Sequence, residues 1–154
     1  ELAPWKEWYF KESLDWDLLH DPMRRKFFRF LEDLGNLYNA RPELWQWDHI
    51  PDGFRWIDCN DSENSVLSYV RFSDRGHLVV ILNLTPVVRH NYRVGAPSPG
   101  TYEEKFNSDS SIYGGSNVGN AGQVITEPIP FHGLPQSLSL TLPPMGALVF
   151  SLKK

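Results

Sequence analysis

The run of aliphatic residues at positions 78–82, within the predicted strand 77–84, constrains the fold more than any other sequence feature. A strand whose consecutive side chains are apolar is buried on both faces, as in the centre of a sandwich. Short segments of strand-like composition surround it, and they lie at residues 54–58, 65–72, 92–95, 101–106, 137–142 and 147–152. Turn-forming clusters separate these segments, so the sequence predicts a mainly β fold, an antiparallel β-sandwich.

Three segments of this region carry more specific patterns. Residues 65–72 lead through the short turn 73–76 into the apolar run, which predicts a β-hairpin. Residues 137–142 alternate serine or threonine with leucine, as expected of a half-buried strand. Residues 107–122 are rich in Ser, Gly and Asn and contain few apolar anchors, so we expect a long, disordered loop there.

A single amphipathic helix is predicted ahead of the strands. Asp21 can cap its first turn, Pro22 suits the first helical position, and Pro42 lies beyond its expected end. Apolar residues recur at spacings of three and four, and these are Met23, Phe27, Phe30, Leu31, Leu34, Leu37 and Tyr38. One helix cannot bury such a stripe alone, so it must dock on the sandwich or on a body outside this chain.

Residues 1–20 combine polar and aromatic side chains without a persistent period, which predicts a long loop. The chain has six tryptophans, and only Trp56 lies within the strand region; the others are Trp5, Trp8, Trp16, Trp45 and Trp47. An indole ring with a polar edge suits stacking on a sugar, and it equally suits burial in a core or an interface. Both interpretations stay open at this point.

Composition narrows the classes of partner. The net charge of −4 argues against nucleic acid, and the basic cluster at residues 24–26 is interpreted as a solvated helix turn. No apolar run is long enough to predict a membrane-spanning helix. The single cysteine, Cys59, fits a reducing, cytoplasmic setting and is predicted to be a buried thiol rather than a nucleophile.

The sequence contains no recognisable set of catalytic residues or metal ligands. Its five histidines are scattered without metal-ligand spacing, so neither a metal nor an organic cofactor is predicted. Asp15 and Asp17 form the one close pair of acids in the aromatic loop, and paired carboxylates can cleave glycosidic bonds. Their spacing also fits solvated loop acids, which is the interpretation we favour. We therefore assign no catalytic residue to this chain.

Two ordered sets of motifs resemble a known family. The first set is Trp5-Lys6-Glu7-Trp8 with residues 13–19, and the second comprises residues 61–68, 83–86, 92–95, 107–109, 113–116 and 142–147. Together they resemble the C-terminal part of the 1,4-α-glucan (glycogen) branching enzymes, within the α-amylase superfamily. The resemblance implies that residues 1–49 form the last loop and helix of a catalytic (β/α)8 barrel, and that residues 50–154 form the C-terminal all-β sandwich domain.

The resemblance also implies a function. Branching enzymes cleave α-1,4 bonds and transfer the glucan segment to form α-1,6 branches in glycogen, with catalytic carboxylates on earlier barrel strands. The motifs that hold those carboxylates do not occur here, which implies a structural segment that is inactive without its missing N-terminal barrel. Trp5, Trp8, Asp15 and Trp16 are expected to bind the α-glucan substrate, although Asp15 and Trp16 could equally hold the loop's own shape. The alternative is a noncatalytic carbohydrate-binding β-sandwich module.

Overall fold

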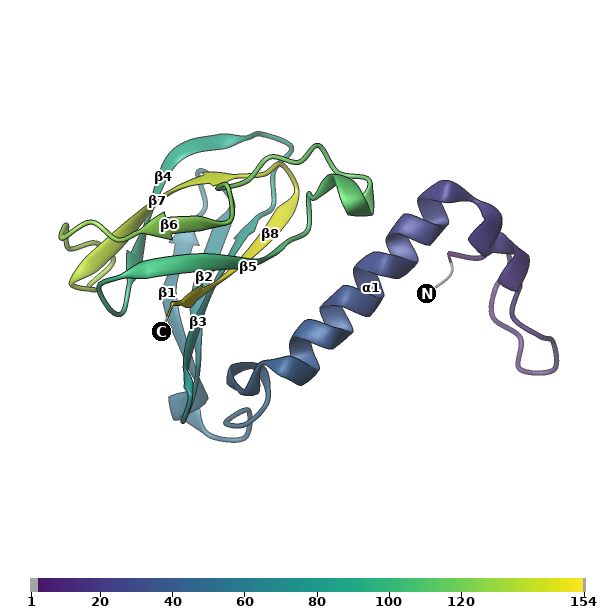
Figure 1. Cartoon of the computed structure of the whole chain (residues 1–154), viewed down its shortest axis with the longest axis horizontal. Helices are drawn as coiled ribbons and strands as arrows, with labels where there is room; N and C mark the ends of the chain where they lie inside the picture. Colours follow the sequence, from purple (N-terminus) through teal and green to yellow (C-terminus); the bar gives the residue numbers. More distant parts are fainter. Residues whose placement is uncertain (1–2, 154) are drawn as a thin grey trace.

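The computed structural model describes residues 3–153 and consists of a β-sandwich, one long helix and an N-terminal segment (Figure 1). The strands are β1 (Phe54–Asp61), β2 (Val66–Ser73), β3 (Gly76–Asn83), β4 (Arg89–Ala96), β5 (Thr101–Asn107), β6 (Gln123–Ile125), β7 (Gln136–Leu142) and β8 (Gly146–Leu152). They pair antiparallel in a six-stranded sheet of order β1-β2-β3-β8-β5-β6 and a two-stranded sheet, β4-β7. The predicted fold class is confirmed.

Strand β3 is central and is buried on both faces, as its aliphatic run predicts. Val79 and Ile81 belong to the main core between the two sheets, which also holds side chains of β4, β7 and β8. Leu78 and Val80 face the other way, into a smaller cluster against which the helix packs. The six-stranded sheet is therefore covered on one face by the β4-β7 sheet, and α1 packs on part of the other face.

The helix α1 (Pro22–Ala40) begins and ends where its sequence signals predict. The Asp21 carboxylate accepts hydrogen bonds from the backbone N–H groups of Met23 and Arg24, at 2.8 and 3.0 Å. These bonds satisfy donors that the first turn cannot pair within the helix. The 3-10 turn η2 (Pro42–Leu44) follows directly and turns the chain towards the sheet. Two further 3-10 turns, η1 (Trp16–His20) and η3 (Pro51–Gly53), flank this region.

The apolar stripe of α1 is divided between two environments. Phe30 and Leu37 pack against the smaller cluster of the sheet. Tyr113 lies edge-on to Phe30 with ring centroids 5.5 Å apart, and its hydroxyl donates to Asp33 at 2.9 Å. Four other residues of the stripe are exposed, Met23, Phe27, Leu34 and Tyr38, and Leu31 is half-buried. In Figure 1 the first half of the helix runs away from the strands, and the loop that carries η4 (Ser111–Tyr113) reaches across to it.

Two sequence predictions are wrong. The loop after β5 is ordered rather than disordered, because the Asp109 carboxylate accepts from the backbone N–H groups of Ser116 and Val118 and from the Ser116 hydroxyl. It leads into the unpredicted strand β6, which pairs with β5. Cys59 is exposed rather than buried, because β1 is an edge strand and this residue faces outward.

Candidate functional site

The four residues predicted to bind substrate all lie in the N-terminal segment, residues 3–20. Figure 1 places this segment at the end of α1 farthest from the sandwich. The indole rings of Trp5, Trp8 and Trp16 are 87%, 76% and 56% exposed, and Asp15 is partly exposed. No residue of this segment that the structure describes is buried. The aromatic rings are thus open to a ligand or to another part of a larger protein.

Lys6 links two parts of the N-terminal segment by ion pairs. Its Nζ lies 2.7 Å from an oxygen of Glu12 and 3.6 Å from an oxygen of Asp15. The hydrogen bond to Glu12, followed by the nearby charge of Asp15, raises the pKa of Lys6 above its ordinary value. Trp8 and Asp15 line one hollow beside this ion pair, with a volume of about 40 Å³. Ligand pockets are nearer 300–1,000 Å³, so this hollow alone does not hold a sugar.

The first turn of α1 anchors the other end of the segment. The Arg24 guanidinium lies 4.5 Å from the centre of the Trp5 ring, and its Nε donates to the carbonyl of Ala3. Arg25 donates to the carbonyl of Leu19 at 3.2 Å. The two arginines therefore contact the protein's own backbone, in addition to the solvent expected around this helix turn. Trp5 and Trp16 do not share the hollow beside Trp8, so the predicted residues occupy one segment without forming one pocket.

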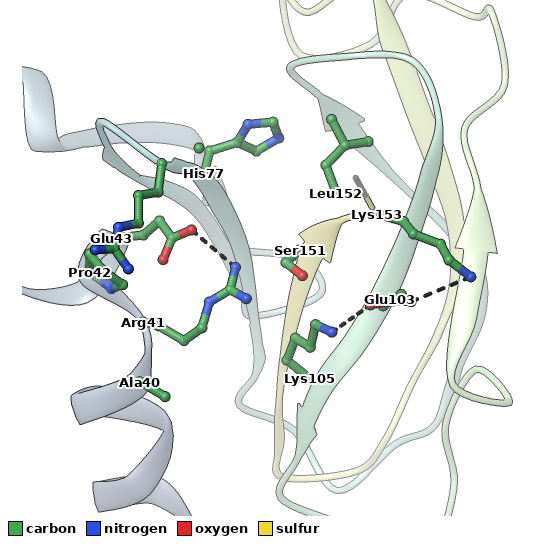
Figure 2. Close-up of a pocket in the computed structure, with 12 residues that line it drawn as sticks. Ala40, Arg41, Pro42, Glu43, His77, Glu103, Lys105, Ser151, Leu152 and Lys153 are labelled. Carbon is green, nitrogen blue, oxygen red and sulfur yellow. Dashed lines mark hydrogen bonds and ion pairs between the residues drawn. The ribbon is translucent and has the colours of Figure 1, made fainter.

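A larger hollow, of about 340 Å³, lies where α1 meets the sheet, and Figure 2 shows its lining. Most of its charged groups pair with one another. Arg41 contacts the buried carboxylate of Glu43 at 3.0 Å, and Lys105 and Lys153 both approach Glu103. Among the described residues, no nucleophile is paired with a base here. The hollow is best explained as a charge-paired junction between the helix and the sandwich.

His77 and Arg71 complete this junction. His77 Nε2 lies 2.7 Å from the Tyr102 hydroxyl, and burial lowers the pKa of the imidazole. Arg71 reaches back from β2 to the carbonyl of Leu44, at 3.1 Å, and to the carboxylate of Asp48, at 2.7 Å. These bonds fix the path of the chain from the helix into the first strand.

An aromatic cluster that the sequence analysis did not identify lies on the outer face of β1 and β2. The rings of Phe54, Trp56 and Tyr69 have centroids 4.9 to 5.9 Å apart, and Phe54 and Trp56 are exposed. Trp56 and Tyr69 are direct cross-strand partners. The three rings meet only because of the register between β1 and β2, so the spacing of these residues in the sequence does not predict the cluster.

No metal centre accompanies these features. Within residues 3–153, no group of three or more His, Cys, Asp or Glu side chains is arranged to hold a metal ion. None of the helices in the described part of the chain is long and apolar enough to span a bilayer.

Comparison with known families now defines the class of protein. Residues 56–153 match the family described as the C-terminal all-beta domain of alpha amylase. This range begins within β1 and ends after β8. The chain therefore belongs to the alpha-amylase C-terminal all-beta domain family, as its resemblance predicts.

The similarity to individual proteins extends beyond that domain. The chain is 49% identical over 152 residues to a 1,4-alpha-glucan branching enzyme of Cellvibrio japonicus, covering 99% of this chain and 21% of that protein. It is 49% identical to a 1,4-alpha-glucan branching enzyme of Salinibacter ruber, covering 97% and 24%. A branching enzyme of Paramagnetospirillum magneticum is 47% identical, covering 100% and 21%. The chain thus spans less than a quarter of the length of these relatives and matches their C-terminal part.

Proposed function

We propose that this chain is the C-terminal segment of a cytoplasmic 1,4-α-glucan branching enzyme. The whole protein would cleave α-1,4 bonds and transfer the glucan segment to a 6-hydroxyl, forming the α-1,6 branches of glycogen. One observation carries the proposal: the match to branching enzymes covers 99% of the chain, although the family domain begins only at residue 56. The loop and helix before the sandwich are therefore part of the similarity.

We assign residues 1–49 to the end of the catalytic (β/α)8 barrel and residues 50–154 to the sandwich domain. The burial pattern supports this division, because no residue from 3 to 41 is buried. The open face of α1, formed by Met23, Phe27, Leu34 and Tyr38, is apolar enough to require a partner layer. The rest of the barrel is the occupant that we propose for this face.

In this arrangement the N-terminal segment is the last βα loop of the barrel. Active sites of such barrels are built from the loops at the carboxyl ends of the strands. Trp5, Trp8 and Trp16 would face the α-glucan with their exposed rings, and Asp15 would accept hydrogen bonds from sugar hydroxyls. The catalytic carboxylates would belong to the preceding part of the protein, so the chain itself supplies structure and substrate contacts.

A chimaera tests this proposal. The chain replaces the corresponding segment of the Cellvibrio japonicus enzyme, and the product is assayed for loss of amylose–iodine colour together with new reducing ends. Branching lowers the colour without a net gain of reducing ends. We expect branching by the chimaera and none by the chain alone. Branching by the isolated chain, or a folded chimaera that does not branch although the unaltered enzyme does, would contradict the proposal.

A second candidate function is that of a noncatalytic carbohydrate-binding module. The cluster of Phe54, Trp56 and Tyr69 favours it, because the exposed rings of Phe54 and Trp56 can support the apolar face of a sugar. Affinity electrophoresis in a glycogen gel tests this function. Retardation of the isolated chain that Trp56→Ala removes would support a module, and equal mobility with and without glycogen would exclude it. The Trp8→Ala and Trp16→Ala variants show whether the N-terminal segment contributes to any retardation.

A further inference from the structure

A second polar groove lies on the sandwich, between the edge strand β1 and strand β4 of the smaller sheet. We call it the edge groove, and its lining includes Asp58, Asn60, Asp61, Asn91, Phe131 and His132. Its volume is about 700 Å³, within the range of small-ligand sites. It belongs to neither the N-terminal segment nor the junction beside α1.

The charged side chains Asp61 and Arg93 on the floor of the edge groove have hydrogen-bond partners within the protein. Asp61 accepts hydrogen bonds from the Tyr92 hydroxyl at 2.5 Å and from both the backbone and the side chain of Asn64. Arg93 donates to Glu127 and Ser137, at 2.9 and 2.7 Å. The donors to Asp61 are neutral, so its negative charge is offset by the nearby Arg89 guanidinium, while the charge of Arg93 is offset by Glu127.

The other polar groups of the lining are only partly satisfied. Arg89 donates to the carbonyl of Asn64 at 3.2 Å, but its Nε and the Nδ1 of His132 are buried without a hydrogen-bond partner among the described residues. Asp58 accepts from the backbone N–H of Asn60 at 2.9 Å and lies 3.5 Å from the imidazole of His132. Because the charges of the lining have opposite charges or donors beside them, the groove favours a neutral ligand over a phosphate or a cation.

The rim, by contrast, carries unused neutral hydrogen-bonding groups. The side chains of Asn60, His90 and Asn91 are exposed and make no hydrogen bond to any residue that the structure describes. Amides and imidazoles both donate and accept, which matches the hydroxyl groups of a sugar. Beside them, the Phe131 ring is 38% exposed and lies 4.2 Å from the His132 ring, centroid to centroid. The groove thus combines an aromatic wall with a polar rim.

The backbone holds this wall in place. A Cβ atom at Gly95 would lie 2.5 Å from the carbonyl oxygen of Phe131, so only glycine lets the loop approach β4 so closely. Asn91 and His132 adopt left-handed backbone conformations, with φ of 55° and 50°. Non-glycine residues in this region are uncommon and persist where the surrounding structure holds them. The backbone around the groove is therefore held in place by the protein itself, without a ligand.

We propose that the edge groove binds a short stretch of α-glucan, with the Phe131 ring against a sugar face and Asn60 and Asn91 bonded to its hydroxyls. The choice of α-glucan rests on the function proposed above, whereas the preference for a neutral polyhydroxylated ligand rests on the groove alone. The β4-β7 sheet covers the face of the large sheet opposite α1. A barrel docked on α1 therefore leaves the groove accessible, where it can hold a second part of a long substrate.

The test is a titration of the ¹⁵N-labelled full chain with maltoheptaose, followed by nuclear magnetic resonance. The side-chain amides of Asn60 and Asn91 should shift with a saturable dependence in the millimolar range, typical of a single weak site. Phe131→Ala should weaken this binding about five-fold or more, since aromatic contacts of this kind contribute on the order of one kcal/mol. Asn60→Ala is a second variant at an exposed position, and Trp8→Ala is a control outside the groove. The dispersed spectrum of each variant reports that it is folded.

Each result decides the proposal. Shifts confined to the groove that Phe131→Ala or Asn60→Ala weakens, and that Trp8→Ala leaves unchanged, support it. Groove signals that do not move up to about 10 mM maltoheptaose, or variants that bind as tightly as the original chain, would overturn it. If the chimaera branches but maltoheptaose does not shift the groove signals, only the groove proposal is contradicted. If the groove binds maltoheptaose but the chimaera does not branch, only the function proposed above is contradicted.

Discussion

The sandwich and the region before it bury apolar side chains to very different extents. In the sandwich, β3, β7 and β8 contribute fully buried side chains such as Leu78, Leu138 and Phe150. In residues 3–41, which include the 19-residue helix α1, no side chain is buried. The sandwich has its own hydrophobic core, whereas the helix region has an apolar face that this chain leaves partly exposed.

The connection between these regions is correspondingly narrow. Phe30 and Leu37 pack on the outer face of the sheet, and the Tyr113–Asp33 hydrogen bond fastens the loop of η4 to the helix. These contacts fix one side of α1 and leave Phe27 and Leu34 exposed. The difference teaches that a well-capped helix can carry an apolar face that this chain leaves largely uncovered, which is why we propose a partner layer for it.

The largest expected effect contrasts two phenylalanines. Phe150→Ala opens a cavity in the main core and should lower the free energy of unfolding by about 3–5 kcal/mol. Phe27→Ala, on the open face of α1, should change it by less than about 1 kcal/mol. Urea denaturation followed by circular dichroism measures both. Similar losses for the two variants would show that α1 is already packed in this chain.

A smaller effect is expected at the link between helix and sandwich. Tyr113→Phe removes the hydrogen bond to Asp33 and should cost about 1 kcal/mol or less, since the pair is partly exposed. A double-mutant cycle with Asp33→Ala isolates this coupling. An additive cycle would mean that the hydrogen bond does not hold the helix.

The same link should weaken at alkaline pH. Burial and the bond to Asp33 raise the pKa of Tyr113 from its ordinary 10.0 to about 12. Its contribution to stability is therefore complete below pH 10 and is lost as the pH rises towards 12. Stability measured across that range should fall more steeply for the original chain than for Tyr113→Phe. Parallel curves would contradict this assignment.

A weaker effect, of a few tenths of a kcal/mol, is expected from Asp61 at acidic pH. Partial burial by itself would raise the pKa of the Asp61 carboxyl, but hydrogen bonds from Tyr92 and Asn64 outweigh it and the pKa lies below 3.8. The stabilisation is present above this ordinary value and is lost as the pH falls through the lowered pKa. Asp61→Asn should flatten the stability profile below pH 4 relative to the original chain, as measured by urea denaturation. A profile of unchanged slope would argue against the bonded floor of the edge groove.

The smallest effect is expected in the N-terminal segment. Lys6→Met breaks the contacts with Glu12 and Asp15, but these groups are exposed, so global stability should not change measurably. Thermal unfolding provides the measurement. A clear loss of stability would show that this segment unfolds cooperatively with the sandwich. The comparison of the two regions predicts that it does not.

Much of the fold is predictable because its signals are local. The aliphatic run of β3, the hairpin before it and the cap at Asp21 each depend on neighbouring residues, and each is confirmed. Order in the loop after β5 is not predictable in this way. It depends on Asp109 reaching residues seven and nine positions away and on Tyr113 meeting a helix eighty residues earlier.

The candidate sites show the same limit. Composition draws attention to Trp5, Trp8 and Trp16, but it does not reveal that Trp8 lies beside Asp15 while Trp5 stacks on Arg24. The aromatic cluster at Trp56 requires the register of β1 and β2, and the edge groove requires two sheets to meet. Cys59 is mispredicted for a related reason, since only the sheet order makes β1 an edge strand.

Hydrogen exchange of α1 tests most directly the claim that its open face belongs to a missing barrel. Backbone amides of α1 and of β3 are compared between the isolated chain and the chimaera with the Cellvibrio japonicus enzyme. We expect the amides of α1 to exchange at least about ten-fold more slowly in the chimaera, while those of β3 stay nearly unchanged. Equal protection of α1 in both proteins would contradict the account, because the helix would then need no partner beyond the sandwich.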